Sequence, residues 1–379
     1  MSVYFDSAAT AIPDADCYRA GLDAALDYPG NPSSIHKSGK EAAEKLEESR
    51  ASCARVLGVK SKTVIFTSGG TEANQIPLFS LLTRSAPGSF AVSAIEHASI
   101  TAQTAILESA GWKKIVLPVT SDGIIDVEHA ITLLKDDTAY ISVMAVNNET
   151  GAIQEVEKLA SLVLHRSRGK KRPHFHVDAV QAAGKILFNY SAEGIDSISI
   201  STHKLGGPKG SGILIAHRQF DSFFKGGEQE GGKRPGTENI GAAVSTAYAL
   251  EKNLSNLEES RRLAQKISNY IIETLNTIPG FSIVPETRLP SDCRFSPWII
   301  QCSQSRFPGE VLVRLLSEKG VYISTGSACS SRKTKRPVLE AMRLPPHIMQ
   351  NAFRISFGPT ATHNDADVLV ETLRSCTRV

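Results

Sequence analysis

The sequence has six cysteines in 379 residues, but no two of them are separated by only two residues. They are Cys17, Cys53, Cys293, Cys302, Cys329 and Cys376. Closely spaced cysteine pairs mark zinc sites, and an ordered cysteine framework marks small disulfide-rich secreted proteins. Because both patterns are missing, we expect a reducing cytoplasm as the compartment and a role for any special cysteine that depends on its reactivity.

Long apolar runs and a strong charge of one sign are also missing. No stretch reaches the roughly 18 apolar residues of a membrane span, and the opening MSVYFDSAAT lacks the basic flank and apolar core of a secretory signal. The net charge of +3 is too small over this length to indicate nucleic acid as the main partner. The densest basic cluster, which spans positions 332 to 336, is local and is explained by a solvated loop. We therefore expect no membrane contact and no direct nucleic-acid contact.

The composition is that of an ordinary globular protein, with 41% hydrophobic and 21% charged residues. From position 64 to position 216, short β-rich runs alternate with amphipathic stretches, which predicts a mostly parallel sheet covered by helices. Ligands of such sheets bind at the carboxyl ends of the strands. The seven predicted strands are Val64–Thr67, Phe90–Ile95, Ile115–Val119, Tyr140–Val146, His174–Val177, Ser197–Ser201 and Gly212–Ala216. The predicted helices are Glu72–Thr83, Ser99–Ala110, Val127–Leu134 and Glu155–Arg168.

The pattern changes after a glycine-rich stretch, Gly226–Gly241. One long helix is predicted over Ala242–Asn276, ending before Pro279-Gly280, and a smaller α+β unit follows it. Its predicted elements are the strands Phe281–Val284, Pro297–Cys302, Val321–Ser324 and Phe353–Phe357 and the helices Gly309–Lys319 and Asp365–Ser375. We place the boundary inside the long helix, which predicts a large domain of residues 14–255 and a small α+β domain of residues 1–13 and 256–379.

Three segments at predicted strand ends carry the residues best suited to chemistry. In FTSGGTEANQ, residues 66–75, a strand runs into Ser-Gly-Gly and a helix that opens with Thr71. Such a turn suits an anion such as phosphate, although a plain helix N-cap would look similar. In HVDAVQAAGK, residues 176–185, Asp178 ends a strand and Gln181 follows within reach of the same ligand. A helix N-cap is an equally good explanation of Asp178.

The third segment, ISISTHKLGGPKGSGILIA, delivers Lys204 from a strand end into a glycine-rich turn. A desolvated ammonium is costly unless it is paired or deprotonated. A lysine beside an acid and a phosphate-type turn matches a pyridoxal phosphate site, where the aldehyde binds a lysine as a Schiff base, the pyridine nitrogen needs an acidic partner and the phosphate needs donors. Lys204 would then be neutral, Ser201 and His203 would add phosphate donors, and His97 at another strand end could stack on the ring.

Ten motifs in this order resemble those of the NifS-like cysteine desulfurases, in the class V aminotransferase group, over nearly the whole chain. They are YFDSAAT (4–10), GNPSSIH (30–36), TSGGTEAN (67–74), EH (96–97), NNETG (147–151), DAVQ (178–181), HKLGGPKGSG (203–212), GTEN (236–239), STGSACSS (324–331) and RISFG (354–358). The resemblance implies an α/β protein with the PLP-dependent transferase fold type I, in which the large domain has a mostly parallel seven-stranded sheet and the smaller domain carries the catalytic cysteine loop.

The resemblance also implies a role for each matching residue. Lys204 is the Schiff-base lysine, Asp178 pairs with the pyridine nitrogen, and Gln181 binds the phenolic oxygen. His97 stacks on the ring and assists proton transfer, and Arg354, with Asn148 nearby, binds the substrate carboxylate. The phosphate is held by Gly70, Thr71, Ser201 and His203, and Thr237 reaches the phosphate of the neighbouring subunit in a homodimer. Small residues surround Cys329 and a basic cluster follows it, which favours the thiolate of a nucleophile. A small buried hydrophobe is the commoner role of cysteine, and we assign it to the other five.

The implied reaction removes sulfur from L-cysteine, giving L-alanine and a persulfide on Cys329. The sulfur then passes to an acceptor such as an iron–sulfur scaffold or a tRNA-thiolation relay. Two alternatives stay open: an enzyme of the selenocysteine lyase or cysteine sulfinate desulfinase type, and a non-enzymatic sulfur carrier with a vestigial site. Intact Lys204, Asp178 and Arg354 argue against the carrier. The chain departs from the family pattern at Glu228, where glycine is usual, and at Gly231, where arginine is usual.

Overall fold

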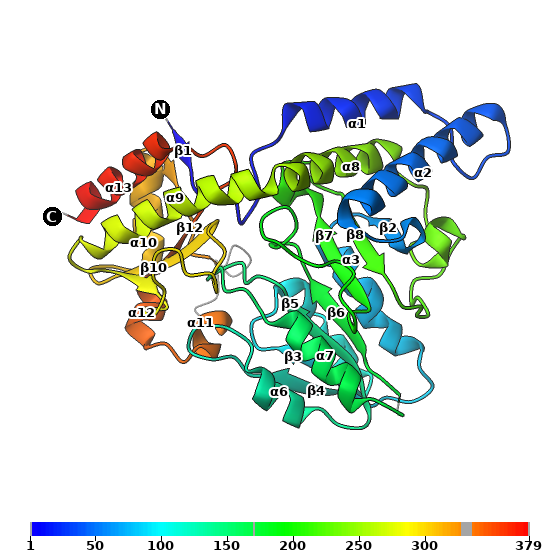
Figure 1. Ribbon diagram of the computed structural model, residues 1–379, viewed down its shortest axis with the longest axis horizontal. Coiled ribbons are helices and arrows are strands. Elements are labelled where there is room, and N and C mark those ends of the chain that lie inside the picture. The colour runs from blue at the N-terminus through cyan, green and yellow to red at the C-terminus, as the bar shows by residue number, and fades with distance from the viewer. Residues whose placement is uncertain (1, 170, 327–335, 378–379) are drawn as a thin grey trace.

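The computed structural model describes residues 2–169, 171–326 and 336–377 (Figure 1). A seven-stranded sheet with the order β2-β8-β7-β6-β5-β3-β4 forms its larger part. Its strands are β2 (Val64–Thr67), β3 (Ser89–Ser93), β4 (Lys113–Leu117), β5 (Thr138–Met144), β6 (His174–Asp178), β7 (Ser197–Ser201) and β8 (Gly212–Ala216). Only β8 runs antiparallel to its neighbours, and the other pairings are parallel. The mostly parallel seven-stranded sheet expected from the sequence is therefore confirmed.

Helices cover this sheet, and several begin or end where the sequence provides a cap. They are α1 (Ala15–Asp27), α2 (Lys37–Leu57), α3 (Gly70–Phe79), α4 (Ala98–Thr101), α5 (Thr104–Ser109), α6 (Val127–Leu133), α7 (Val156–Arg166) and α8 (Ile240–Ser255). Gly58 ends α2 in the left-handed conformation with a φ of 66°. The single helix predicted over Ser99–Ala110 is instead the pair α4 and α5, and at the break the Thr104 hydroxyl donates to the Thr101 carbonyl. Such side-chain bonds compete with the helix ladder.

The long helix predicted over Ala242–Asn276 is also two helices, α8 and α9 (Leu257–Asn276). They meet at Asn256, whose φ of −107° and ψ of 13° leave the helical region. Its side-chain amide donates to the Lys252 carbonyl, 2.9 Å away. Asparagine hydrogen-bonds nearby backbone groups in this way, so it favours helix ends over helix interiors.

The described residues of the smaller part of the molecule form two short sheets and four helices besides α9 (Figure 1). β9 (Phe281–Val284), β10 (Ile299–Gln304) and β12 (Ala352–Ser356) form an antiparallel sheet, and β1 (Val3–Tyr4) pairs in parallel with β11 (Val321–Tyr322). The helices are α10 (Gly309–Glu318), α11 (Pro337–Ala341), α12 (Pro346–Asn351) and α13 (His363–Thr377). Because of β1, the first residues of the chain belong to this part, next to α13.

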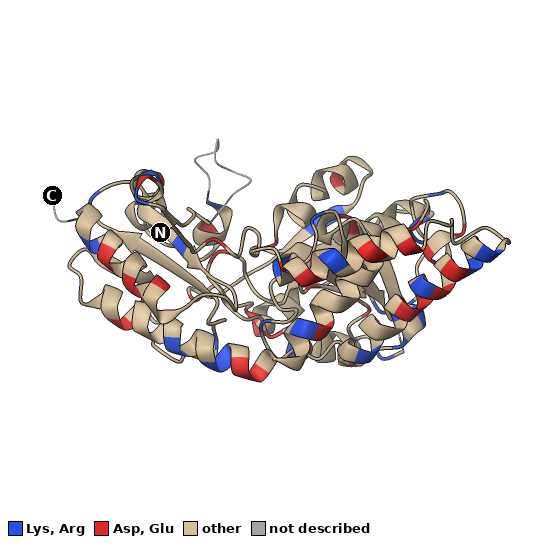
Figure 2. Cartoon of the chain, turned by 90° about the horizontal axis from the view of Figure 1, so that it is seen from above, with Lys and Arg blue, Asp and Glu red and all other residues tan. Residues whose placement is uncertain are grey.

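Two large apolar cores fill the two parts. One contains strand and helix residues from Cys17 to Leu250, and the other joins Val3, Phe5 and Ala8 to side chains between Ala264 and Cys376. Charged residues of both signs lie on the outward faces of the helices (Figure 2). Among the described residues, no helix is both long enough and apolar enough to cross a membrane.

Candidate active site

The carboxyl ends of β2, β6 and β7 lie at one edge of the sheet and bring three of the predicted segments together. β2 and β7 both run antiparallel to β8, so they point the same way. A Cβ added at Gly70 would lie 2.8 Å from Cγ2 of Val180 and 3.4 Å from Cβ of Ser201. Only glycine therefore fits between the turns that follow β6 and β7. The start of α3, the end of β7 and the turn after Asp178 form one cradle.

The first turn of α3 offers backbone donors to this cradle. No side chain caps the helix, and the first backbone bond of its N-terminus runs from the Ala73 amide to the Gly69 carbonyl, 3.0 Å away. The amides of Gly70 and Thr71 precede that bond, as the free donors at a helix start do. Ser201, which is buried, packs against the same turn. His203 points toward the N-terminal segment, where its Nδ1 lies 3.1 Å from Oγ1 of Thr10.

Asp178 ends β6 as a carboxylate that is only 4% exposed. Its Oδ2 accepts from Nδ2 of Asn74 at 2.8 Å, and its Oδ1 accepts from the Val180 amide at 3.0 Å. Asn74 is held in turn by His176, whose Nε2 lies 2.9 Å from the Asn74 Oδ1. These partners are all neutral, and no ion pair to Asp178 occurs among the described residues. The carboxylate keeps its lone pairs for a cationic ligand atom such as a protonated ring nitrogen.

Lys204 lies in the turn after β7 and reaches the segment that follows β1. Its Nζ donates to the carbonyls of Ala8 and Ala9, at 2.7 and 2.6 Å. Gln181 donates from Nε2 to the same Ala8 carbonyl at 2.8 Å. Burial lowers the pKa of His97, while the Asp178 carboxylate acts against burial and the Lys204 ammonium acts with it. The charges of Asp178 and Lys204 therefore both act on the protonation of the His97 ring.

Arg354 enters this region from β12 of the smaller part and is only 2% exposed. Its Nη1 donates to the Asn148 carbonyl at 2.8 Å and the Gly326 carbonyl at 3.1 Å, and its Nη2 donates to Oδ1 of Asp6 at 2.6 Å. The structure thus brings Arg354 and Asn148 together. It also adds Asp6, a carboxylate that occupies one arm of the guanidinium. A substrate carboxylate must share that arm or displace Asp6.

One predicted residue that the structure describes is not joined to this group. Thr237 is exposed in the segment before α8, and no side-chain hydrogen bond links it to the other predicted residues within the described ranges. Cys329 lies outside the described residues. The other cysteines, apart from the exposed Cys293, are buried. Burial raises the pKa of Cys17 to about 11 and the pKa values of Cys53 and Cys302 to about 12, which disfavours their thiolates.

Sequence reasoning did not single out Asn74, Asp6, Lys185 or Glu96. Asn74 and Lys185 stand inside motifs noted for other residues, and each is a polar residue at a position that becomes buried. Glu96 accepts from the Ser93 hydroxyl at 2.5 Å and from the Met144 amide at 2.8 Å. Burial raises its pKa to about 7. For Asn74, Lys185 and Glu96, the available sequence signal of a buried functional residue was a polar residue within an apolar run. Asp6 had no such signal.

The described residues fit the pyridoxal phosphate expected from the sequence. The helix start supplies donors without a side-chain cap, and the glycine cradle leaves room where a side chain would clash. A buried carboxylate without a cationic partner faces the same region as a lysine amine. The three functional parts of the cofactor, its phosphate, ring nitrogen and aldehyde, each have a group of matching chemistry.

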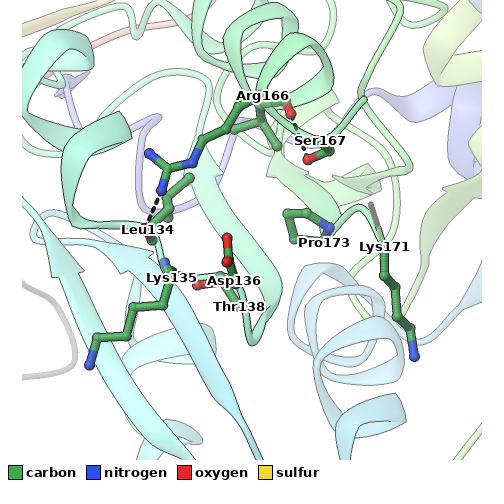
Figure 3. Close-up of a pocket in the computed structure, with 9 residues that line it drawn as sticks. Leu134, Lys135, Asp136, Thr138, Arg166, Ser167, Lys171 and Pro173 are labelled. Carbon is green, nitrogen blue, oxygen red and sulfur yellow. Dashed lines mark hydrogen bonds between the residues drawn. The ribbon is translucent and has the colours of Figure 1, made fainter. Parts of the chain in front are cut away.

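A separate hollow lies between Leu134, Arg166 and Pro173, at the amino ends of β5 and β6 (Figure 3). Arg166 donates there to the carbonyls of Ile131 and Leu134, both at 2.8 Å. At about 3.3 Å per residue, the length of β6 separates this hollow from Asp178. Because ligands of parallel sheets bind at the carboxyl ends of the strands, we assign the hollow no part in the candidate site.

Comparisons with known proteins agree with this geometry. The sequence matches the family described as aminotransferase class-V over residues 3–369. It is 34% identical over 374 residues to a NifS/IcsS protein homolog of Lactobacillus delbrueckii subsp. bulgaricus, covering 97% of this chain and 95% of that protein. It is 33% identical over 377 residues to the cysteine desulfurase IscS of Methanosarcina thermophila, covering 98% of this chain and 90% of that protein. A solved NifS-like protein superposes with a TM-score of 0.90, at 31% identity and 99% coverage of both chains.

Proposed function

This chain belongs to the aminotransferase class-V family, and we propose on that basis that it is a cysteine desulfurase that uses pyridoxal phosphate. The observation that carries the proposal is the placement of Lys204, Asp178 and Arg354 around one end of the sheet in a chain that is alignable with cysteine desulfurases over nearly its full length. The products are L-alanine and an enzyme-bound persulfide.

The cofactor would be held by the residues at the strand ends. Lys204 would bind its aldehyde, Asp178 its pyridine nitrogen and Gln181 its phenolic oxygen, while His97 would stack on the ring. The phosphate would lie against Gly70, Thr71, Ser201 and His203 of one subunit and Thr237 of the other. When bound, pyridoxal phosphate supplies a ring that takes up the electron pair left on the α-carbon of an amino acid after a proton departs.

The proton transfers would belong to Lys204 and His97. When its Nζ is not bound to the cofactor, Lys204 would accept the α-proton of the substrate. Nζ then lies beside the Ala8 and Ala9 carbonyls, which accept hydrogen bonds from its protonated form. Burial favours the neutral form of His97 by lowering its pKa, so the ring can accept a proton at neutral pH. Arg354 would bind the substrate carboxylate in place of Asp6.

Cys329 would take the sulfur. Its thiolate attacks the substrate sulfur, so that a sulfur–sulfur bond forms and the carbon–sulfur bond of the substrate breaks. The carbon keeps the electron pair and is protonated, which gives L-alanine and leaves the sulfur as a persulfide on Cys329. An acceptor protein, an iron–sulfur scaffold or a tRNA-thiolation relay, would then receive it. We place this reaction in a reducing cytoplasm, which the free thiols of Cys17, Cys53 and Cys302 support.

The working unit would be a homodimer in which each site receives Thr237 from the partner. The apolar face of α1 supports this proposal, because Tyr18, Leu22 and Leu26 recur every four residues and are exposed. Ile35, which is 91% exposed, follows the same helix. Within each subunit, the two apolar cores support a large domain of residues 14–255 and a small domain of residues 1–13 and 256–379.

The test is incubation of the protein, loaded with pyridoxal phosphate, with L-cysteine and a reductant, while sulfide and alanine are measured together. Equal amounts of both products are expected. Cys329→Ser removes the soft nucleophile, so it should still bind cofactor and L-cysteine but lose nearly all sulfide release. Arg354→Ala should fail differently, with weak substrate binding, because a charge-assisted pair worth roughly 1.5–3 kcal/mol is lost.

The same assay with selenocysteine and cysteine sulfinate separates the alternatives. If Cys329→Ser keeps wild-type rates on L-cysteine, the persulfide mechanism is wrong and the lyase-type reaction takes its place. A pure protein that binds no cofactor and releases no sulfide would instead identify a sulfur carrier.

A further inference from the structure

Lys185 is a buried lysine beside the candidate site that the mechanism above does not use. It lies one turn after Gln181, and its residue is only 7% exposed. Its Nζ donates to Oε1 of Gln181 at 2.8 Å, and within the described ranges no carboxylate pairs with it. The charged groups near it, Lys204 and Arg354, carry the same sign. A buried ammonium without an anionic partner is costly, so its position calls for a functional reason.

The backbone of Lys185 is fixed from two sides. Its amide donates to the Ala182 carbonyl at 3.0 Å, and its carbonyl accepts from Nε1 of Trp298 at 2.9 Å. Trp298 belongs to the core of the smaller part. The side chain therefore projects from an anchored position, and the fold selects Gln181 as its acceptor among the described residues.

The Gln181 amide has only one orientation that satisfies both of its neighbours. Its oxygen faces the Lys185 amine, which can donate, and its nitrogen faces the Ala8 carbonyl, which can only accept. The Ala8 carbonyl also accepts from Lys204 at 2.7 Å. One hydrogen-bonded path therefore links the two lysines through Gln181 and Ala8. The second N–H of Gln181 would then be the donor to the phenolic oxygen under the proposed function.

We propose that Lys185 is a positioning residue that holds Gln181 by its amide oxygen and places a positive charge beside Lys204, so that a proton on the Lys204 nitrogen is disfavoured. The inference rests on the proposed function, in which Lys204 must act without its proton. A lysine beside a second cation is activated in this way. The titratable and charged groups that face Lys185 are Lys204 and His203 after β7 and Arg354 on β12.

The electrostatics agree with this geometry. Burial, together with Lys204 and Arg354, lowers the pKa of Lys185 to about 7, so its positive charge acts on Lys204 below that pH and is lost above it. Lys204 and Lys185 also act after burial to lower the pKa of His203 to about 4. Repulsion between two charges is mutual. The positive charge of Lys185 therefore disfavours a proton on Lys204 as much as the charge of Lys204 disfavours a proton on Lys185.

The test measures the visible absorption of pyridoxal phosphate bound to the protein as a function of pH, without substrate. The midpoint of the absorption change reports the proton on the Lys204 nitrogen. Lys185→Met should raise this midpoint by about one pH unit and weaken cofactor binding about tenfold or less. Lys185→Gln, which keeps a donor to Gln181 without the charge, should raise the midpoint equally but bind cofactor like the wild type. Lys185→Arg should leave the midpoint at or below its wild-type value.

Lys158→Met is the matched control, because Lys158 is an exposed lysine on α7, and it should change neither quantity. Thermal unfolding of each variant shows whether it is folded. A midpoint that stays unmoved in both Lys185→Met and Lys185→Gln overturns the proposal. A midpoint that moves equally in Lys185→Arg and Lys185→Met also overturns it, because packing would then be the cause. Failure of the wild type to bind the cofactor at all would overturn the proposed function as well, whereas an unmoved midpoint leaves that function intact.

Discussion

Asp178 keeps its position through a buried hydrogen-bond path rather than through an opposite charge. Asn74 donates to it, His176 contacts Asn74, and Nδ1 of His176 lies 2.8 Å from the Ser197 hydroxyl. Asn74 can donate to Asp178 only if its oxygen faces His176, and His176 must then carry its proton on Nε2. The path needs the proton on Nε2 of His176, and burial disfavours a second proton on this ring.

The pH dependence of stability should therefore reveal His176. Burial lowers its pKa to about 3, below its usual value near 6.5. In this range the unfolded chain binds the proton and the folded chain does not, so the stability contribution is complete above pH 6.5 and is lost as pH falls toward 3. The free energy of unfolding in urea should fall by about 1.4 kcal/mol per pH unit below 6.5 on account of this residue.

His176→Gln supplies the comparison, because glutamine can donate to Asn74 but does not titrate. The variant should be less stable at pH 7, and the difference from the wild type should shrink as the pH is lowered to 5. A difference that stays constant over that range would show that folding does not lower the pKa of His176.

At the scale of elements, one buried ion pair fastens the segment before α8. Arg50 of α2 contacts both carboxylate oxygens of Glu230, at 2.6 and 2.9 Å, and Glu230 also accepts from the Phe66 amide of β2. Glu230 has a φ of 50°, in the left-handed region that costs a side chain energy. The pair holds this strained turn against the sheet. Thr237 follows seven residues later, so its position depends on this anchor.

Arg50→Met should cost about 3–5 kcal/mol of unfolding free energy, because it leaves a buried carboxylate without its partner. It should also weaken cofactor binding by loosening the segment that carries Thr237. Arg55→Met is a matched change on the same helix, where the pair with Glu251 is exposed, and it should cost less than about 1 kcal/mol. Urea unfolding checks both values, and equal losses in the two variants would contradict the anchoring role.

The strands were the elements most predictable from sequence. β2, β7, β8 and β9 begin and end at the predicted residues, because runs rich in isoleucine, valine and serine are bounded there by glycine, proline or a turn. The helices were less predictable. α1 and α2 were not among the predicted elements, and the predicted long helix is broken at Asn256, where a side chain competes for the backbone.

Site residues were predictable where their chemistry is local and were not where it depends on distant partners. Asp178, Gln181 and Lys204 each stand at a strand end that the sequence predicts. Asp6 pairs with Arg354 across 348 positions of the chain, and Asn74 pairs with Asp178 across 104 positions. No local pattern announces such pairs, because the fold alone brings them together.

At the scale of the whole molecule, the exposed face of α1 predicts the oligomeric state. Leu22→Glu should place a charge in the centre of the proposed interface, so the variant should sediment as a monomer and lose most of its desulfurase activity. Val368→Glu on α13, another exposed apolar residue, is the control and should leave both properties unchanged. A wild-type chain that sediments as an active monomer would rule out the dimer.

The segment that follows β1 has a consequence for the order in which the protein matures on the ribosome. Val3 pairs with Val321, the Ser7 amide donates to the Ser356 carbonyl, and the Ala8 amide donates to the Ser356 hydroxyl. This segment therefore waits for partners that are synthesised 348 positions later in the chain. Until then the Ala8 and Ala9 carbonyls have no fixed place beside Lys204, even if the large sheet has already formed. Contacts this distant in sequence form late, so catalytic competence should be acquired only after Ser356 has been synthesised and has folded against this segment.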